Sequence, residues 1–273
     1  MDAAAKIKKA LKIDPRDIKS KLTTFIKEKV EKAEANGVVV GLSGGLDSST
    51  TVFLCTSALG ASRVLGVSMP EAGVTDPHDV ADARSMANKL GIGFRIVDIT
   101  PAVLGVRTNL TDFRIDALLP AANIKPRVRM TTLYYYANLL NHLVVGSSCH
   151  SELRLGYFTK YGDGAADLLP LGYLYKTQVK QLASYLGVPE RIIRKVPSAG
   201  LWKGQTDEAE LGLPYEKIDM IYAGLDLGLK LDDIAEATGV KKVDVKNFMK
   251  REQMNAHKFK GPEIPKLLSL CRH

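Results

Sequence analysis

The residues best suited to chemistry lie in one short segment, VVVGLSGGLDSST at 38–50, where an apolar run gives way to glycine and serine. The pattern predicts a strand, a tight turn and the start of a helix, where free backbone N–H groups attract phosphate. Gly44 and Gly45 lack a Cβ and let the main chain approach a ligand closely, while Ser43 and Ser48 offer hydroxyl donors. The segment therefore predicts a phosphate-binding loop.

Asp47 is the carboxylate in this loop, and it would repel phosphate unless a cation lay between them. Carboxylate and phosphate oxygens are the ligands that Mg²⁺ prefers, which predicts a magnesium site; an ordinary helix N-cap is the alternative. The loop lacks the GK[ST] ending of the Walker type and the GxGxxG spacing of dinucleotide-binding folds. It is therefore a phosphate loop of another type.

Strand-like and helix-like segments alternate around this loop through the first half of the chain. Apolar strands separated by helices of about ten to fifteen residues are typical of a parallel sheet covered on both faces. The sequence predicts an α/β fold of the doubly wound, Rossmann-like type, with a mainly parallel sheet and helices on both faces. The expected strands are 38–43, 63–70, 94–100 and 143–148, and the expected helices are 15–35, the segment from the loop to 58, 76–90 and 128–141.

The pattern changes after residue 150. Segments 151–170 and 197–213 are rich in glycine and polar residues without a clear period, which predicts long loops, and loops of this length are commonly functional. Helical patterns dominate from Lys176 onward, so a helical C-terminal part is expected. No internal repeat or low-complexity linker interrupts the chain, which favours one domain over 1–273.

Charge and composition narrow the class of protein. The 273 residues carry a formal net charge of +8, with 45% hydrophobic and 25% charged residues, which is globular composition. The positive charge favours an anionic partner, whether nucleic acid, a membrane surface or a polyphosphate, or else it reflects solvated lysines on helix faces. No apolar run approaches the ~20 residues of a membrane span, and the first residues lack the apolar centre of a signal peptide. Three scattered cysteines fit a reducing cytoplasm.

The loop SGGLDSS resembles the signature of the N-type ATP pyrophosphatases, which cleave ATP between its α- and β-phosphates and adenylate an oxygen of the substrate. Three further segments resemble the ammonia-dependent NAD synthetases of that superfamily: NIKPRVRM at 123–130, and the longer stretches at 144–179 and 197–215. The resemblance covers nearly the whole chain. It implies the Rossmann-like fold of the adenine nucleotide alpha hydrolases.

The resemblance also implies an activity. Such an enzyme is a carbon–nitrogen ligase of NAD biosynthesis that takes deamido-NAD, ATP and ammonia through an acyl adenylate, and that yields NAD, AMP and pyrophosphate. A homodimer with an active site shared between subunits is expected. Free ammonia is the expected nitrogen donor, because the nucleotide-binding region begins near residue 38 and none of Cys55, Cys149 and Cys271 has the setting of a nucleophile.

Positions that match the family's motifs carry its residue roles as expectations. Asp47 and Glu152 are expected to ligate Mg²⁺, and Lys176 is expected to neutralise charge on the leaving pyrophosphate. Ser147 stands where the family usually has threonine, and the change keeps the hydroxyl. The expected ATP site is Gly41, Leu42, Ser43, Gly44, Gly45, Leu46, Asp47, Ser48, Ser147, Lys176 and Ser198.

The same resemblance implies a deamido-NAD site. Asp167 is expected to contact this substrate and to bind ammonium beside the nicotinyl ring, which makes it the fourth expected catalytic residue with Asp47, Glu152 and Lys176. The family's C-terminal run His-Lys-Arg is interrupted at Phe259, so one phosphate contact is lost unless Lys260 replaces it. The expected deamido-NAD residues are Arg127, Lys160, Asp167, His257 and Lys258.

Two other functions stay open at this point. A relative that adenylates another substrate, such as a GMP synthetase-like or tRNA-modifying enzyme, would share the phosphate loop. Segment 229–253 resembles a helix-turn-helix with Gly239 at the turn, which would suit a nucleic-acid-binding module. Base reading usually needs Arg, Asn or Gln near the start of the second helix, where Lys241, Lys242 and Asp244 stand. The segment is therefore expected to be structural, and neither a specific nucleic acid nor a membrane is an expected partner.

Overall fold

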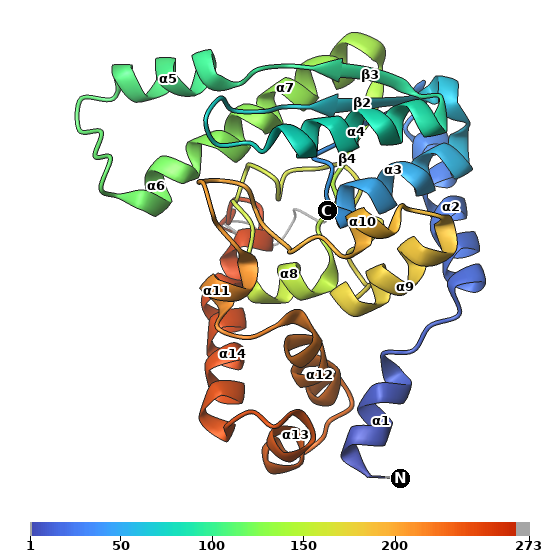
Figure 1. Ribbon diagram of the computed structural model, residues 1–273, viewed down its shortest axis with the longest axis vertical. Coiled ribbons are helices and arrows are strands. Elements are labelled where there is room, and N and C mark those ends of the chain that lie inside the picture. The colour runs from blue at the N-terminus through green and yellow to red at the C-terminus, as the bar shows by residue number, and fades with distance from the viewer. Residues whose placement is uncertain (1, 266–273) are drawn as a thin grey trace.

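Four parallel strands form one sheet, labelled in Figure 1. The computed structural model describes residues 2–265. The strands are β1 (Gly37–Gly41), β2 (Val64–Ser68), β3 (Gly93–Ile96) and β4 (His142–Val145). They lie in the order β3-β2-β1-β4, and every pair is parallel. This confirms the predicted parallel α/β sheet.

Successive residues of β1 point to opposite faces of the sheet, and helices cover both faces. Val38 and Val40 belong to one apolar core, whereas Val39 packs with Leu65 and Val144 into another. This alternation explains why the strand is apolar throughout. The first face is covered by α2 (Pro15–Lys32), α3 (Leu46–Leu59), α4 (Pro77–Leu90), α9 (Lys176–Leu186) and α10 (Glu190–Ile193), and the second by α5 (Thr100–Asn109) and α7 (Ile124–Leu140).

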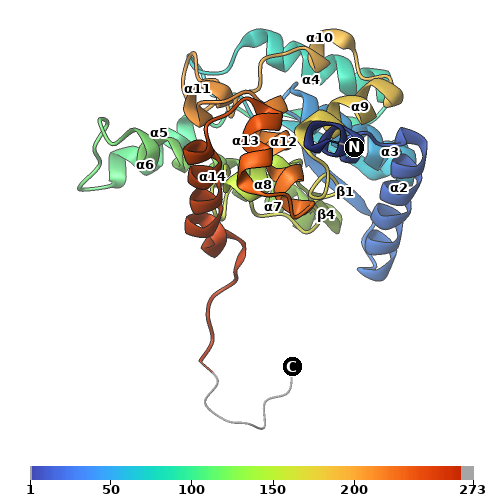
Figure 2. The same ribbon diagram turned by 90° about the horizontal axis from the view of Figure 1, so that it is seen from below.

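A third apolar cluster lies among the C-terminal helices, away from the sheet (Figure 1). It surrounds Tyr215 and Tyr222, both fully buried. The N-terminal helix joins this cluster through Ile7 and Leu11, so the first helix of the chain packs on the C-terminal helices α12 and α13 (Figure 2). The helices involved are α1 (Ala3–Ala10), α8 (His150–Leu155), α12 (Tyr215–Asp226), α13 (Leu231–Thr238) and α14 (Lys242–Asn255).

The strands lie within a few residues of their predicted positions, and the differences lie in the helices. The sequence did not predict α1, α5 or α6 (Leu118–Ala122). Both expected loops hold short helices, α8 in the first and α11 (Asp207–Leu211) in the second, and the short 3-10 turns are η1 (Ala61–Arg63) and η2 (Ala256–Phe259). The helix-turn-helix resemblance corresponds to α13 and α14. No helix within 2–265 is both long enough and apolar enough to cross a membrane.

Candidate active site

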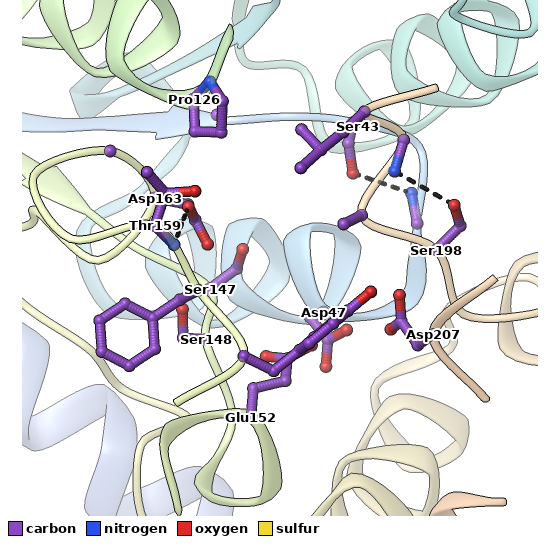
Figure 3. Close-up of a pocket in the computed structure, with 18 of the residues that line it drawn as sticks. Ser43, Asp47, Pro126, Ser147, Ser148, Glu152, Thr159, Asp163, Ser198 and Asp207 are labelled. Atoms are coloured by element: carbon purple, nitrogen blue, oxygen red, sulfur yellow. Dashed lines mark hydrogen bonds between the residues drawn. The ribbon is translucent and has the colours of Figure 1, made fainter. Parts of the chain in front are cut away.

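A cavity of about 1090 Å³ opens at the carboxyl ends of the central strands. The chain runs from β1 to β2 and β3 on one side, and β4 lies on the other side of β1, so the loops after β1 and β4 diverge. In open α/β sheets, ligands bind at this switch point. The cavity is lined there by the phosphate loop, residues 144–148 and loop 195–205, where Figure 3 labels Ser43, Ser147 and Ser198. One face of α14 completes the lining.

The phosphate loop is organised by its own serines. Ser48 Oγ accepts the N–H of Ser43 at 3.3 Å and lies 3.0 Å from Ser43 Oγ, so the two hydroxyls meet at the start of α3. Because α3 begins at Leu46, its first N–H groups have no partner within the helix. Those N–H groups and the two hydroxyls are the donors that a phosphate group needs.

Gly44 is required by a neighbouring helix. Its φ is +81°, and a Cβ there would lie 2.2 Å from the carbonyl oxygen of Asp79 on α4. Lys195 secures this contact, because its Nζ donates to the Gly44 carbonyl at 3.0 Å and to Asp79 at 2.7 Å. Gly45 lines the cavity and Gly44 does not, as far as the described residues form it. The missing Cβ at Gly44 is therefore also required by the close approach of α4.

The base of the cavity holds a fully buried lysine between two carboxylates. Lys176 Nζ donates to Asp47 Oδ2 and to Glu152 Oε1, both at 2.7 Å, and 1% of its side chain is exposed. The ammonium also lies over the ring of Tyr215, 4.8 Å from the ring centroid. Burial alone would lower the pKa of Lys176, but the charges of Asp47 and Glu152 hold it well above its usual value. The ammonium therefore stays charged inside the protein.

The two carboxylates fit a divalent cation. Burial raises the pKa of Asp47 to about 6 against the opposing charge of Lys176, and the charge of Glu152 adds to the rise. Asp47 Oδ1 is buried and has no hydrogen-bond partner among the described residues. Magnesium commonly takes one or two carboxylates together with substrate phosphates. No group of three or more His, Cys, Asp or Glu within 2–265 is arranged around a common metal position, so two carboxylates are what this site offers.

Side chains from two other helices fix where Lys176 leaves the backbone. It is the first residue of α9, and Ser151 Oγ accepts its N–H at 2.9 Å. Asp219 accepts the N–H of Thr177 at 2.8 Å and the hydroxyl of Ser151 at 2.5 Å, and its side chain is fully buried. The start of a helix leaves N–H groups without partners. Here α8 and α12 supply those partners, which sets the position of the lysine.

Most of the expected ATP and metal residues meet in this cavity, and one of the expected substrate residues joins them. Ser147 lies on the loop after β4, and Ser198 lies on loop 195–205 (Figure 3). The expected residues that line the cavity are Gly41, Leu42, Ser43, Gly45, Leu46, Asp47, Ser48, Ser147, Glu152, Lys176, Ser198 and Lys258.

The other four expected substrate residues lie outside the lining that the described residues form. Arg127 donates to the Lys160 carbonyl at 3.4 Å, and Lys160 Nζ donates to the His257 carbonyl at 2.9 Å, so these three adjoin one another. Asp167 lies beside β4, where its Oδ2 accepts the N–H of Val144 at 2.7 Å. These four residues therefore adjoin the cavity wall or the C-terminal segment and do not line the cavity that holds the lysine and its two carboxylates.

Asp207 and Arg129 are among the charged residues of the cavity wall that were not predicted. Asp207 is 3% exposed, its Oδ2 accepts the hydroxyl of Tyr215 at 3.1 Å, and its buried Oδ1 has no partner among the described residues. It faces the same part of the cavity as Asp47 (Figure 3). Arg129 donates from Nε to the carbonyl of Met69 at 3.2 Å and also lines the cavity. Both lie in segments that the sequence singled out, 123–130 and 197–215, so position in those motifs was the available signal.

Comparison with known proteins gives consistent matches over most of the chain. The family model described as NAD synthase matches residues 18–262. The NH(3)-dependent NAD(+) synthetase of Methanosarcina mazei is 42% identical over 255 residues, which are 93% of this chain and 100% of that protein. The structure of NMN synthetase from Francisella tularensis is similar with a TM-score of 0.81 and 34% identity, covering 94% of this chain and 100% of that one. The NH3-dependent NAD synthetase from Campylobacter jejuni gives a TM-score of 0.77 at 32% identity, covering 93% and 100%.

We predict that Gly44→Ala destabilises the protein more than Gly60→Ala. Both glycines have a positive φ, +81° and +83°, but no atom lies within 4 Å of a Cβ built on Gly60. The control Gly60→Ala should therefore lower the free energy of unfolding only through backbone strain, by about 1–3 kcal/mol. Gly44→Ala must also displace the Asp79 carbonyl and the phosphate loop. Urea unfolding measures the difference, and ATP titration should show weaker binding for Gly44→Ala alone. Equal losses in the two variants would contradict the role assigned to the α4 contact.

Proposed function

We propose that this chain, which belongs to the NAD synthase family, is an ammonia-dependent NAD synthetase that amidates the nicotinate carboxylate of deamido-NAD. The observation that carries the proposal is the Lys176 ammonium held between Asp47 and Glu152 beside the phosphate loop. A reaction that cleaves ATP needs fixed positive charge and metal-binding carboxylates at its phosphates. Both stand here next to free N–H groups at the start of a helix.

The first step forms an acyl adenylate. A carboxylate oxygen of the substrate attacks the α-phosphorus of ATP, the bond to the bridging oxygen of the β-phosphate breaks, and pyrophosphate leaves with that electron pair. The phosphate loop binds the phosphates through its N–H groups and through Ser43 and Ser48. Lys176 neutralises the negative charge that develops on pyrophosphate, while Ser147 and Ser198 contact the nucleotide from the opposite loops.

Magnesium is part of this proposal, with Asp47 and Glu152 as its protein ligands. Their convergence on one cation and the spare Oδ1 of Asp47 support the assignment. Bound Mg²⁺ supplies Lewis-acid stabilisation to the phosphate oxygens. Lys176 holds one oxygen of each carboxylate, and Asp47 Oδ1 would be available to the metal.

Ammonia then attacks the acyl carbon, AMP leaves, and the nitrogen loses a proton. We assign Asp167 to hold ammonium; its oxygens accept the N–H of Val144 and the hydroxyl of Tyr134, and a carboxylate has room for further donors. Glutamine is not expected to replace ammonia. Burial raises the pKa of the Cys55 thiol to about 12 and that of Cys149 well above its usual value, so neither forms the thiolate that a glutaminase needs. Cys271 lies outside the described residues.

A second substrate of the same chemical class has a specific observation in its favour. The structure with a TM-score of 0.81 is described as an NMN synthetase, and amidation of the corresponding nicotinate mononucleotide would give NMN. The reacting carboxylate is the same in both compounds, so the site geometry supports either reaction. We favour deamido-NAD because the expected substrate residues extend beyond the cavity to Arg127, Lys160 and His257, which a longer dinucleotide can reach.

The direct test mixes the protein with ATP, Mg²⁺ and ammonium, and adds deamido-NAD or nicotinate mononucleotide in parallel. We expect NAD from deamido-NAD, together with stoichiometric AMP and pyrophosphate, and a rate that rises with pH at fixed total ammonium because ammonia is the nucleophile. ADP in place of AMP would refute the adenylate mechanism. Faster turnover of the mononucleotide would make NMN synthesis the function.

We predict that Asp47→Asn and Glu152→Gln each lower kcat by about two orders of magnitude or more, because stabilisation of the phosphate charge is lost. Both changes keep the shape of the side chain, so the fold should survive, which circular dichroism can check. Asp232→Asn is the matched control, since this carboxylate is exposed and pairs with Lys242 on the far helices. Near-normal rates for either site variant at saturating Mg²⁺ would show that the ligands are wrongly assigned.

A homodimer with a shared site is the proposed assembly. Exposed apolar side chains gather on α5, α6 and α7, and Leu119 in this group also lines the active-site cavity. Apolar patches of this kind mark interfaces, and a partner placed here would adjoin both the cavity and Arg127 on α7. The exposed residues of the group are Leu104, Val106, Leu110, Leu118, Leu119, Tyr135, Leu139 and Leu140.

We predict that Leu139→Glu shifts the protein from dimer to monomer and lowers NAD synthesis with it. Leu139 is 63% exposed on α7, and a charge buried at an interface without a partner is costly. Tyr185→Glu on α9 is the control, because Tyr185 is 48% exposed on a helix that covers the other face of the sheet. Analytical ultracentrifugation measures the mass. A wild-type monomer, or a dimer that survives Leu139→Glu, would locate the interface elsewhere or remove it.

The proposal also covers the setting of the enzyme. Cys55 and Cys149 are free, which fits the reducing cytoplasm. We take residues 1–273 as one domain that works there.

A further inference from the structure

A second buried ion pair lies behind the wall of the cavity. Lys125 Nζ is 2.6 Å from Glu71 Oε2, and the two side chains are 5% and 7% exposed. Glu71 lies in the segment after β2, and Lys125 lies in the first turn of α7. The pair therefore joins two parts of the fold that approach the cavity from different strands. The catalytic steps described above do not use either residue.

The same lysine reaches a third part of the chain. Its Nζ also donates to the backbone carbonyl of Leu201, in loop 195–205. The Leu201 N–H donates to Gln205 Oε1 at 2.7 Å, and Gln205 donates to Glu210, again at 2.7 Å. Glu210 in turn accepts the hydroxyl of Tyr157 at 2.7 Å. The loop is thus attached on one side by Lys125. On the other side it is attached by the hydrogen bonds that run through Gln205 and Glu210 to Tyr157.

Loop 195–205 links the ion pair to the active site. Among the described residues, neither Lys125 nor Glu71 lines the cavity of the active site, whereas Ser198, Leu201 and Trp202 do. A charged donor makes a stronger hydrogen bond to a carbonyl than a neutral one does. Glu71 places an opposite charge beside that donor in a buried position, where an ammonium without such a partner would be unfavourable. The attachment of the loop therefore depends on the ion pair.

We propose that Lys125 and Glu71 are positioning residues that hold loop 195–205 over the cavity and so protect the acyl adenylate from water. The inference rests on the proposed function, in which this adenylate waits for ammonia. With the loop open, a water oxygen attacks the acyl carbon, AMP leaves with the electrons of the broken bond, and the substrate carboxylate is regenerated. ATP is then consumed and AMP formed without any amide, so the ratio of AMP to amide reports on the loop.

The chain contains a reporter for this loop that does not depend on activity. Trp202 is its one tryptophan, and it follows directly the residue that Lys125 holds. Lys203 comes next and is exposed, which makes it a trypsin site whose cleavage requires the loop to leave the wall. Tryptophan emission and cleavage after Lys203 therefore report loop attachment even in an inactive protein.

The experiment compares Lys125→Met, Glu71→Met and the double variant with the parent chain. We expect the ratio of AMP to amide to rise about tenfold in all three, as loss of a positioning contact commonly costs, with red-shifted Trp202 emission and faster cleavage after Lys203. The single variants leave one buried charge unpaired and should unfold at lower urea than the parent. The double variant removes both charges and should recover stability without recovering the AMP ratio. A double variant with recovered stability but a raised ratio of AMP to amide shows that the pair positions the loop and does not merely stabilise the fold. If the single variants do not fold, the double variant alone tests this role.

Lys180→Met with Glu216→Met is the matched control, because it removes an ion pair of 2.7 Å between α9 and α12. This control variant should leave the ratio of AMP to amide, the Trp202 emission and the cleavage after Lys203 unchanged. A folded double variant at Lys125 and Glu71 with parental emission, cleavage and AMP ratio would overturn the proposal. If the parent chain makes no amide at all, the proposed function fails, while Trp202 and Lys203 still show whether the pair holds the loop.

Discussion

The burial of one ammonium constrains much of this structure. A lysine charge inside a protein is stable only with partners, and Lys176 has Asp47 and Glu152 at 2.7 Å. Those carboxylates come from the first turn of α3 and from the first turn of α8, so three separate segments must meet at one point. The trio carries one net negative charge, which leaves the site able to accept a further cation with its polyphosphate.

Topology makes that meeting possible. The strand order β3-β2-β1-β4 sends the chain away from β1 in one direction and returns it on the other side. The loops after β1 and β4 therefore separate, and the space between them is the cavity. The C-terminal helices then complete the arrangement, because Asp219 on α12 and Ser151 on α8 hold the start of α9 that carries Lys176. The helical layer below the sheet thus supports the chemistry directly.

The sequence predicted those features that depend on neighbouring residues. The apolar run of β1 reports burial on both faces, and the glycines after it report a tight turn into α3. α1 and α5 escaped prediction because they are short and become stable through packing on distant elements, as Ile7 does on the C-terminal helices. The contact of Gly44 with Asp79 was not predicted for the same reason, since Asp79 lies on another helix. The partnership of Lys125 with Glu71 is likewise a contact between distant segments, which one sequence does not reveal.

The two helices that resemble a DNA-binding motif show how position decides function. Val245 and Phe248 of α14 are buried in the C-terminal cluster. Asn247, Lys250 and Arg251 line the cavity of the active site, so part of the polar side of α14 faces that cavity. Just beyond the helix, Lys258 donates to the carbonyls of Gly156 and Phe158 at 2.6 and 3.0 Å, which fastens the segment to the cavity wall. Basic side chains suit the phosphates of a nucleic acid and of a nucleotide equally. Here the fold encloses them with the phosphate loop, and a small phosphorylated substrate is the anion that can reach both.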